Sequence, residues 1–380
     1  MDFDLTETQT AVVAAARAIA REVVAPAAHQ GDRSGRFPTA IIRQLGEAGL
    51  LAINVPEELG GAGAGPVAYV LAMMEIAAAD CAVAVTMAVT NMVGETVARY
   101  GTAAQRERCC PKLASAEWLA GSFALSESQA GSDPASLSTR AERRSERWVL
   151  NGEKQWITSG DVAGVMVVWA RSDAAEKGKR GITAFLVEAG APGLHVGRHE
   201  QKMGIRASST VSLTFEDCAV PDEAVLGEVG DGFKIAMAAL DGGRTGIAAQ
   251  ATGTIRAALE ASTRYALERR AFGQPIAGFQ ALRFMLADMQ TEHDAARLLT
   301  LRAAALKAAG RPFSREAAMA KLFASEASQR AVSRAVQIHG GYGYLDDFPV
   351  ERLFRDARVQ TLYEGTSEIQ RLVIARELLR

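Results

Sequence analysis

One carboxylate near the end of the chain is placed where it could act as a base. Glu364 follows Tyr363 and precedes Gly365, a residue that lets backbone and ligand approach closely. A carboxylate can take a proton from carbon when it lies against that carbon, and burial among apolar groups raises its pKa toward the working range of a base. Taken alone, Tyr-Glu-Gly is more typical of a carboxylate that interacts with the dipole of a helix N-terminus than of a catalytic base.

Two adjacent glycines mark a second candidate site. Gly242 and Gly243 lie between Asp241 and Arg244 in a segment with helical periodicity, where each glycine costs about 1 kcal/mol relative to alanine. A ligand that comes close to the helix would explain this cost. A simple kink is the alternative.

The strongest turn signal lies between two β-rich runs. Trp148–Leu150 and Lys154–Thr158 flank Asn151-Gly152, a pair that accepts positive φ at both central turn positions. The pattern predicts a hairpin. Within it, Trp156 taken alone fits an ordinary core aromatic.

These candidates lie in three stretches of different periodicity. Between Thr6 and Trp118, apolar residues recur at three- and four-residue spacing, which predicts amphipathic helices. Short β-rich runs then predict a sheet folded on itself as a small barrel. Besides the hairpin, these runs are Val165–Ala170, Ile182–Val187, Leu194–Val196 and Thr210–Phe215. Helical periodicity returns at Gly232, and its breaks predict about four long helices and hence a bundle.

The predicted fold class is therefore multidomain α and β. It has an N-terminal all-α domain at residues 1–120, a middle small β-barrel domain at 121–230 and a C-terminal four-helix-bundle domain at 231–380. Strands and helices do not alternate, which argues against a dinucleotide-binding βαβ fold. The Gly-rich segment 60–66 lacks a preceding apolar strand and full GxGxxG spacing, so we expect a plain loop there.

Composition argues against several other classes of protein. The 42 basic and 44 acidic residues are spread along the chain, unlike the basic face of a nucleic-acid binder. No charge-free apolar run of about 18 residues and no secretory leader pattern occur, so neither a membrane span nor export is expected. The four cysteines lack metal or redox spacing, which predicts reduced thiols. His195 and His199 lie in a broken β region, so no metal site is expected.

Three longer segments give these candidates a context. The first is Ala124-Leu125-Ser126-Glu127-Ser128-Gln129-Ala130-Gly131-Ser132-Asp133. The second is Gln337-Ile338-His339-Gly340-Gly341-Tyr342-Gly343-Tyr344, continuing to Asp356, and the third is Tyr363-Glu364-Gly365-Thr366-Ser367-Glu368-Ile369-Gln370. In this order they resemble the signature segments of the acyl-CoA dehydrogenase family. The resemblance covers nearly the whole chain, and the helix–sheet–helix order is the fold of that family.

The resemblance implies a reaction and a base. Glu364 would take the α-proton of an acyl-CoA thioester, while the β-hydrogen leaves as hydride to the flavin of FAD on the opposite side of the acyl chain. The backbone N–H of Glu364 and a flavin ribityl hydroxyl would bind the thioester oxygen. The other residues implied to contact the substrate are Ser132, Asp241, Gly242, Gly243, Arg244, Tyr363 and Gly365.

The resemblance also implies how FAD is held. Trp156 would pack on the isoalloxazine, and Thr158 would form a hydrogen bond with the ring nitrogen that receives hydride. Arg269, Phe272 and Gln280 match positions that hold the FAD of a neighbouring subunit, which implies a homo-oligomer, expected to be a tetramer. The full set of implied FAD residues is Phe123, Leu125, Ser126, Gly131, Ser132, Trp156, Ile157, Thr158, Arg269, Phe272, Gln280, Gln337, Gly340, Gly341, Thr366, Ser367 and Glu368.

The run from Asp241 to Ala248 most resembles short-chain, butyryl-type members. It implies acyl groups of about four to six carbons, with overlap between neighbouring lengths, fatty-acid β-oxidation, and an electron-transferring flavoprotein as electron acceptor. The alternatives are a branched- or medium-chain acyl-CoA dehydrogenase, an acyl-CoA oxidase and an inactive acyl-CoA-binding scaffold. Isovaleryl-type members carry their base where this chain has Gly243. The expected location is the bacterial cytoplasm, or the mitochondrial matrix only if a transit peptide is missing from this chain.

Overall fold

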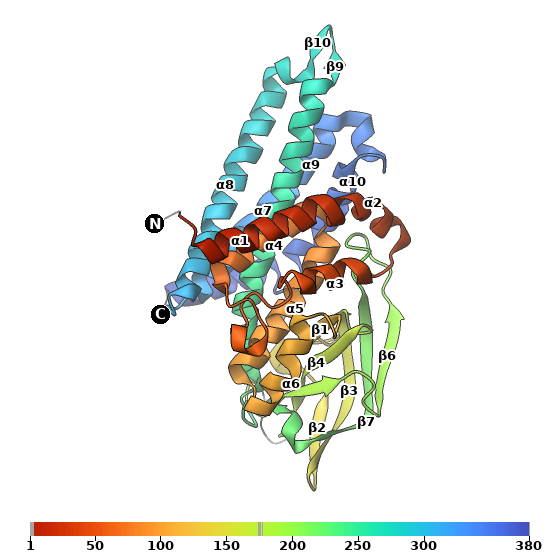
Figure 1. Cartoon of the computed structure of the whole chain (residues 1–380), viewed down its shortest axis with the longest axis vertical. Helices are drawn as coiled ribbons and strands as arrows, with labels where there is room; N and C mark the ends of the chain where they lie inside the picture. Colours follow the sequence, from red (N-terminus) through yellow and green to blue (C-terminus); the bar gives the residue numbers. More distant parts are fainter. Residues whose placement is uncertain (1–3, 174–175, 177, 380) are drawn as a thin grey trace.

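The computed structural model describes residues 4–173, 176 and 178–379. Helices come first, then a sheet, then helices, as predicted (Figure 1). The first helices are α1 (Glu7–Ile19), α2 (Ala25–Ser34), α3 (Thr39–Glu47), α4 (Gly65–Ala79), α5 (Cys81–Tyr100) and α6 (Ala103–Ala114). The Gly-rich segment before α4 is a loop that follows a single 3-10 turn, as expected.

Helices α4 and α5 form the buried centre of this part. Both are apolar nearly all round, which is the pattern of a helix with no face in water. Asp80 caps α5, since its carboxylate accepts a hydrogen bond of 2.6 Å from the N–H of Ala82. By length and composition α5 could also cross a membrane, but 89% of its apolar window is buried inside the fold, and core helices pass the same test.

The middle part is one bent sheet. Its strands are β1 (Ala120–Ala124), β2 (Arg140–Arg144), β3 (Arg147–Thr158), β4 (Ala163–Arg171), β5 (Ile182–Glu188), β6 (Leu194–His199), β7 (Thr210–Pro221) and β8 (Val225–Leu226). The order is β6-β7-β3-β2-β4-β5-β8, and β1 lies parallel to β4. Trp148, Phe185 and Phe215 fill the core that this sheet encloses. Among the described strands no pairing joins β6 to β8, so the sheet bends round this core without closing as a full barrel.

The hairpin prediction at Asn151-Gly152 was wrong. Strand β3 runs straight through this pair, and its register against β7 shifts between Leu150 and Gly152, which is a β-bulge. The Asn151 side chain accepts a hydrogen bond of 2.8 Å from the N–H of Asp217 on β7. Gly152 has φ 144°, and a Cβ there would lie 2.7 Å from the Cα of Thr139. The pair is therefore used for a bulge, and the turn that joins β2 to β3 lies at Ser145, with φ 58°.

The C-terminal part is a bundle of α7 (Gly232–Glu268), α8 (Gln280–Ala308) and α9 (Ser314–His339), with the shorter α10 (Pro349–Ala357) and α11 (Ser367–Leu378). We expected about four long helices; among the described residues there are three. The rest of the helical pattern is divided between α10 and α11. The break falls where Glu364 and Gly365 have φ of 55° and 89°, which a helix cannot accommodate.

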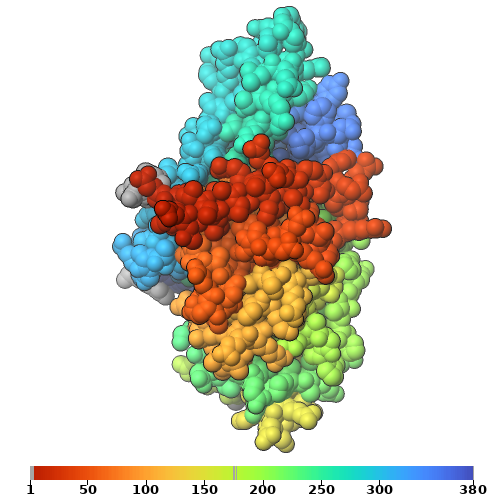
Figure 2. All heavy atoms as spheres, in the orientation of Figure 1, coloured from red at the N-terminus to blue at the C-terminus, as the bar shows by residue number. Residues whose placement is uncertain are grey.

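A small projection ends the bundle. Strands β9 (Arg270–Ala271) and β10 (Gln274–Pro275) form a hairpin between α7 and α8. Figures 1 and 2 show this end of the bundle standing out beyond the helices α1 and α2 that lie across the molecule. At the hairpin, Phe272 is 94% exposed, which is unusual for a phenylalanine.

Candidate active site

A cavity of about 360 Å³ lies where α5, α7, the sheet and the segment before α11 meet. Half of the residues proposed from the sequence for catalysis, cofactor contact and substrate contact line this one cavity. They are Phe123, Leu125, Ser126, Gly131, Ser132, Trp156, Thr158, Gly243, Arg244, Tyr363, Glu364 and Gly365. The structure therefore brings together residues that are up to 242 positions apart in the chain, from Phe123 to Gly365.

Glu364 faces α7 from this cavity. Its carboxylate atom Oε2 is buried and has no hydrogen-bond partner among the described residues. Burial raises the pKa of Glu364 to about 7, against the opposing effect of the positive charges of Arg244 and Lys321. Helix α11 begins at Ser367 with Thr366 as its cap, so Glu364 lies outside the helix, and its side chain points away to α7. This geometry disfavours the interpretation as a helix N-terminal carboxylate.

The adjacent glycines of α7 make room for that carboxylate. A Cβ on Gly243 would lie 2.4 Å from Oε2 of Glu364 and 2.9 Å from its Cδ. A Cβ on Gly242 would lie 3.1 Å from Nζ of Lys307. The helix continues unbroken from Gly232 to Glu268, so the glycines do not mark a helix break. The group that comes close to the helix is thus the protein's own Glu364.

Two residues that sequence reasoning missed hold the Glu364 segment in place. The ammonium of the fully buried Lys321 on α9 donates a hydrogen bond of 2.7 Å to the carbonyl of Gly365. The Gln370 amide donates to the carbonyls of Gly365 and Glu364 at 2.8 and 3.2 Å. Burial lowers the pKa of Lys321 to about 8, although Glu364 opposes this shift. A lysine on an otherwise alanine-rich buried face of α9 was a signal that could have identified it.

Trp156 is not a core aromatic. Its side chain is 55% exposed, and its backbone has φ 60°, a strained conformation for a bulky residue. Gly131 lies near the ring: a Cβ added at this glycine would be 3.9 Å from atom Cζ3 of the indole. A flat, uncovered ring on the cavity wall is suited to stacking against a planar group. Thr158 lies on the same strand, and its carbonyl accepts a hydrogen bond of 2.8 Å from the hydroxyl of Ser122.

A buried ion pair supports the loop that carries Ser126 and Ser132. The ammonium of Lys154 on β3 lies 2.7 Å from Oε1 of Glu127, and both side chains are almost fully buried. Although burial opposes it, the pair with Lys154 holds the pKa of Glu127 at about 2. The backbone N–H groups of Ser138 and Thr139 also donate to Glu127. This pair, which we did not single out from the sequence, fixes the loop against strand β3.

Some predicted residues lie outside this cavity. The side chain of Ile157 is buried in the core of the sheet, so only its backbone is available to a cofactor. Thr366 caps α11, Ser367 is buried, and Glu368 is exposed. Asp241 forms an ion pair with Arg244 and accepts a hydrogen bond from the hydroxyl of Ser314. Asp241 lines a neighbouring cavity, which also reaches Arg244.

The remaining predicted residues form a second group at the far end of the bundle. Arg269, Gly340 and Gly341 line a separate cavity there. The guanidinium of Arg269 lies over the ring of Tyr342, 5.3 Å from its centre. Gln337 is exposed at the end of α9. Phe272 and Gln280 belong to the same end, at the hairpin and the start of α8. The structure does not bring this group to Glu364 within one chain.

Within the described residues, no group of three or more His, Cys, Asp or Glu side chains could hold a metal ion. His195 and His199 lie exposed on β6. All four cysteines are free and buried.

Comparison with known proteins assigns the family. The family models for the N-terminal, middle and C-terminal domains of acyl-CoA dehydrogenase match residues 6–117, 122–218 and 230–379. The chain belongs to the acyl-CoA dehydrogenase family. The dehydrogenase is an oxidoreductase that acts on the CH–CH group of acyl-CoA.

Its relatives match along their full length or nearly so. The mitochondrial short-chain specific acyl-CoA dehydrogenase of Mus musculus is 48% identical, over 99% of this chain and 91% of that protein. The structure of butyryl-CoA dehydrogenase from Megasphaera elsdenii has a TM-score of 0.97 and is 40% identical, with all of both chains covered. A chain in a solved structure of the electron transferring flavoprotein of Acidaminococcus fermentans has a TM-score of 0.98 and is 42% identical, again with all of both chains covered.

Proposed function

We propose that Glu364 is the base with which this dehydrogenase takes the α-proton of a short-chain acyl-CoA. The observation that carries the proposal is the carboxylate atom Oε2, which is enclosed and unpaired at the cavity wall. A base works best when its pKa lies near the working pH, and the pKa of Glu364 is about 7. The proton would move from the α-carbon to this oxygen.

The backbone beside Glu364 supports a second role. Among the described residues the N–H of Glu364 has no hydrogen-bond acceptor, whereas the carbonyls of Glu364 and Gly365 are occupied by Gln370 and Lys321. A free N–H next to the base can donate to the thioester oxygen and stabilise the negative charge that grows there. Lys321 and Gln370 would position both the carboxylate and this N–H.

The part of the cavity that Trp156 and Gly131 line fits FAD. The ring of Trp156 is exposed, Gly131 presents no side chain toward it, and the loop with Ser126 and Ser132 is fixed by the buried Glu127 ion pair. FAD, when bound, supplies the acceptor for the β-hydrogen. Trp156 would stack on the planar ring and Thr158 would form a hydrogen bond with it. Of the other proposed FAD contacts, Phe123 lies on β1, Leu125 directly follows that strand, and Ile157 lies on β3 between Trp156 and Thr158.

The second group of residues supports an oligomer. Arg269, Phe272, Gln280, Gln337, Gly340 and Gly341 gather far from the cavity of their own chain, so we propose that they hold the FAD of a neighbouring subunit in a homotetramer. Phe272 is 94% exposed in the single chain, and an apolar side chain this exposed supports a position that another subunit covers in the assembly. The relatives support a short acyl chain and an electron-transferring flavoprotein as electron acceptor. We further propose domains at residues 1–120, 121–230 and 231–380, in a bacterial cytoplasmic protein.

The test compares the wild type with Glu364→Gln in anaerobic stopped-flow mixing with butyryl-CoA. The amide keeps the shape of the side chain and the backbone N–H but cannot accept a proton. Flavin bleaching should slow by several orders of magnitude, while FAD content and butyryl-CoA binding remain. A variant that reduces its flavin at nearly the wild-type rate would show that Glu364 is not the base.

A further inference from the structure

The segment that carries Glu364 is anchored on both sides. Lys321 and Gln370 hold the backbone carbonyls that follow its Cα. On the preceding side, the hydroxyl of Tyr363 donates a hydrogen bond to Oε1 of Gln250 on α7. Gln250 is fully buried and lies outside the set of described residues that line the cavity of Glu364. Any effect of Gln250 on the reaction must therefore pass through another residue.

The amide of Gln250 is itself held in place. Its Nε2 donates a hydrogen bond of 2.9 Å to the carbonyl of Cys81 at the start of α5. A carbonyl can only accept, so the amide nitrogen faces Cys81 and the amide oxygen faces the other way. One turn further along α7, the hydroxyl of Thr254 accepts a hydrogen bond of 2.8 Å from Gln360, and Gln360 accepts one of 2.7 Å from Ser328 on α9. These side chains are all fully buried, so the acceptor oxygen of Gln250 has a fixed position.

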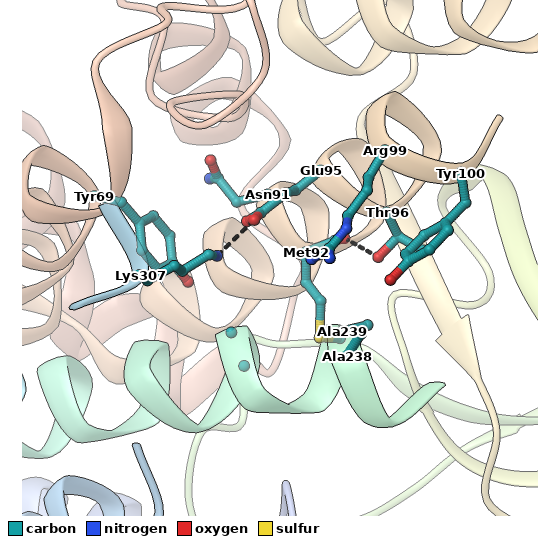
Figure 3. Close-up of a pocket in the computed structure, with 12 residues that line it drawn as sticks. Tyr69, Asn91, Met92, Glu95, Thr96, Arg99, Tyr100, Ala238, Ala239 and Lys307 are labelled. Atoms are coloured by element: carbon teal, nitrogen blue, oxygen red, sulfur yellow. Dashed lines mark hydrogen bonds and ion pairs between the residues drawn. The ribbon is translucent and has the colours of Figure 1, made fainter. Parts of the chain in front are cut away.

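Helix α7 is a firm support for this anchor. Figure 3 shows Tyr69 of α4 and Lys307 of α8 beside α7, where they share the lining of a small cavity with Gly243. Gly243 admits the carboxylate of Glu364, and Gln250 follows it by seven residues, which is about two turns and returns to the same face of the helix. One face of α7 thus sets both the space for the carboxylate and the anchor of the residue before it.

The backbone at Glu364 depends on such support. Its φ is 55°, a left-handed conformation that is unfavourable for a residue other than glycine and persists only where the surrounding contacts hold it. The bond between Gln250 and Tyr363 holds the peptide that joins Tyr363 to Glu364. That peptide carries the N–H proposed to bind the thioester oxygen, and the Cα that follows carries the proposed base.

We propose that Gln250 is a positioning residue for the dehydrogenation: by holding the Tyr363 hydroxyl, it sets where the N–H and the carboxylate of Glu364 meet the thioester. This inference rests on the proposed function, because it takes Glu364 as the base. Without the anchor, the Tyr363–Glu364 peptide can turn toward a relaxed conformation, which moves the N–H away from the oxygen on which negative charge develops. The α-proton then leaves less readily, although the thioester still binds through the rest of the cavity.

The test isolates the transfer of the α-proton. In 3-thiabutyryl-CoA a sulfur replaces the β-carbon, so no hydride can leave, and the thioester can only lose its α-proton to Glu364. The enolate that remains absorbs at long wavelength beside the oxidised flavin, and this band measures the ratio of enolate to neutral analogue at saturation. Gln250→Met keeps the size of the side chain without its amide. We expect the ratio to fall by about tenfold through misplacement of the N–H and the base, with wild-type FAD content and retained binding of the analogue.

Two further variants separate positioning from general destabilisation. Tyr363→Phe removes the same bond from the other side and should give the same loss, and the double variant with Gln250→Met should lose no more than either single variant. Thr252→Val is the matched control. It removes a buried hydroxyl of α7 whose hydrogen bond of 2.8 Å to the carbonyl of Ala248 stays within the helix, so the wild-type ratio should remain.

A wild-type ratio of enolate to neutral analogue in Gln250→Met would overturn the proposal. Losses that multiply in the double variant would also overturn it, since they would show that the two side chains act separately. If Gln250→Met does not fold, Tyr363→Phe decides the question by the same measurement. A wild type that neither forms the enolate nor reduces its flavin with any acyl-CoA would instead refute the proposed function.

Discussion

The substitution Gly243→Ala tests whether the glycine at position 243 of α7 makes room for the carboxylate of Glu364, the proposed base. The added Cβ would lie 2.4 Å from Oε2 of Glu364, where ordinary contacts begin at 3.4 Å. The carboxylate must therefore retreat by about 1 Å, and a misplacement of that size in a catalytic group can cost about 10²-fold in rate. This loss corresponds to about 2.7 kcal/mol of transition-state stabilisation.

The fold should not suffer from the same change. Position 243 lies inside the unbroken helix α7, where alanine is favoured over glycine by about 1 kcal/mol. The displaced atoms belong to the end of one side chain, which can move without shifting the backbone. The melting temperature and the FAD content should therefore equal or exceed those of the wild type, so a loss of rate would report the position of the carboxylate.

The assay is stopped-flow reduction of the flavin by butyryl-CoA without oxygen. Gly31→Ala is the control, because it also replaces a helical glycine and its Cβ would make only an ordinary contact of 3.5 Å with Ala207. The control should reduce its flavin at the wild-type rate. If Gly243→Ala did so as well, the inferred fit between Gly243 and Glu364 would be wrong.

Three further predictions follow from the same site and from the bundle tip. The double variant Glu364→Gly with Gly243→Glu should recover part of the rate of flavin reduction that Glu364→Gln loses, because a Cβ at position 243 begins 2.4 Å from the present carboxylate. If the rate did not recover, a carboxylate at position 243 could not reach the same α-carbon. The kcat/KM of the wild type should rise with pH through a midpoint of about 7, as Glu364 loses its proton. Lys321→Met should move this midpoint upward, because the positive charge of Lys321 lowers the pKa of Glu364. An unmoved midpoint would count against an electrostatic effect of Lys321 on Glu364. Arg269→Ala should lower FAD retention and shift the assembly to smaller species in light scattering. Arg270→Ala, which changes the exposed neighbouring arginine, should do neither. An Arg269→Ala variant that remained a tetramer with full FAD would refute the contact across subunits.

Local patterns were sufficient for the order of the elements and for proposing Glu364 as the base. The change from helical to strand periodicity after Gly121, and back at Gly232, is written in neighbouring residues, and it predicted the three parts of the fold. The eight residues around Glu364 led to the proposal of this base, because a signature segment is a local property. The same local patterns predicted about four long helices, whereas the described residues form three, with the shorter α10 and α11 in place of the fourth.

Contacts between distant residues decided the rest. Asn151-Gly152 favours a turn by itself, but Asp217, 66 residues away, engages the asparagine side chain and makes the pair a bulge. Lys321 holds the carbonyl of Gly365, 44 residues away, and no local pattern records that bond. The space for the Glu364 carboxylate is provided by Gly243, and its raised pKa comes from the burial that the assembled cavity imposes. The sequence by itself indicated which carboxylate to propose as the base; only the tertiary structure, which buries this carboxylate and places α7 against it, determined its raised pKa and its position.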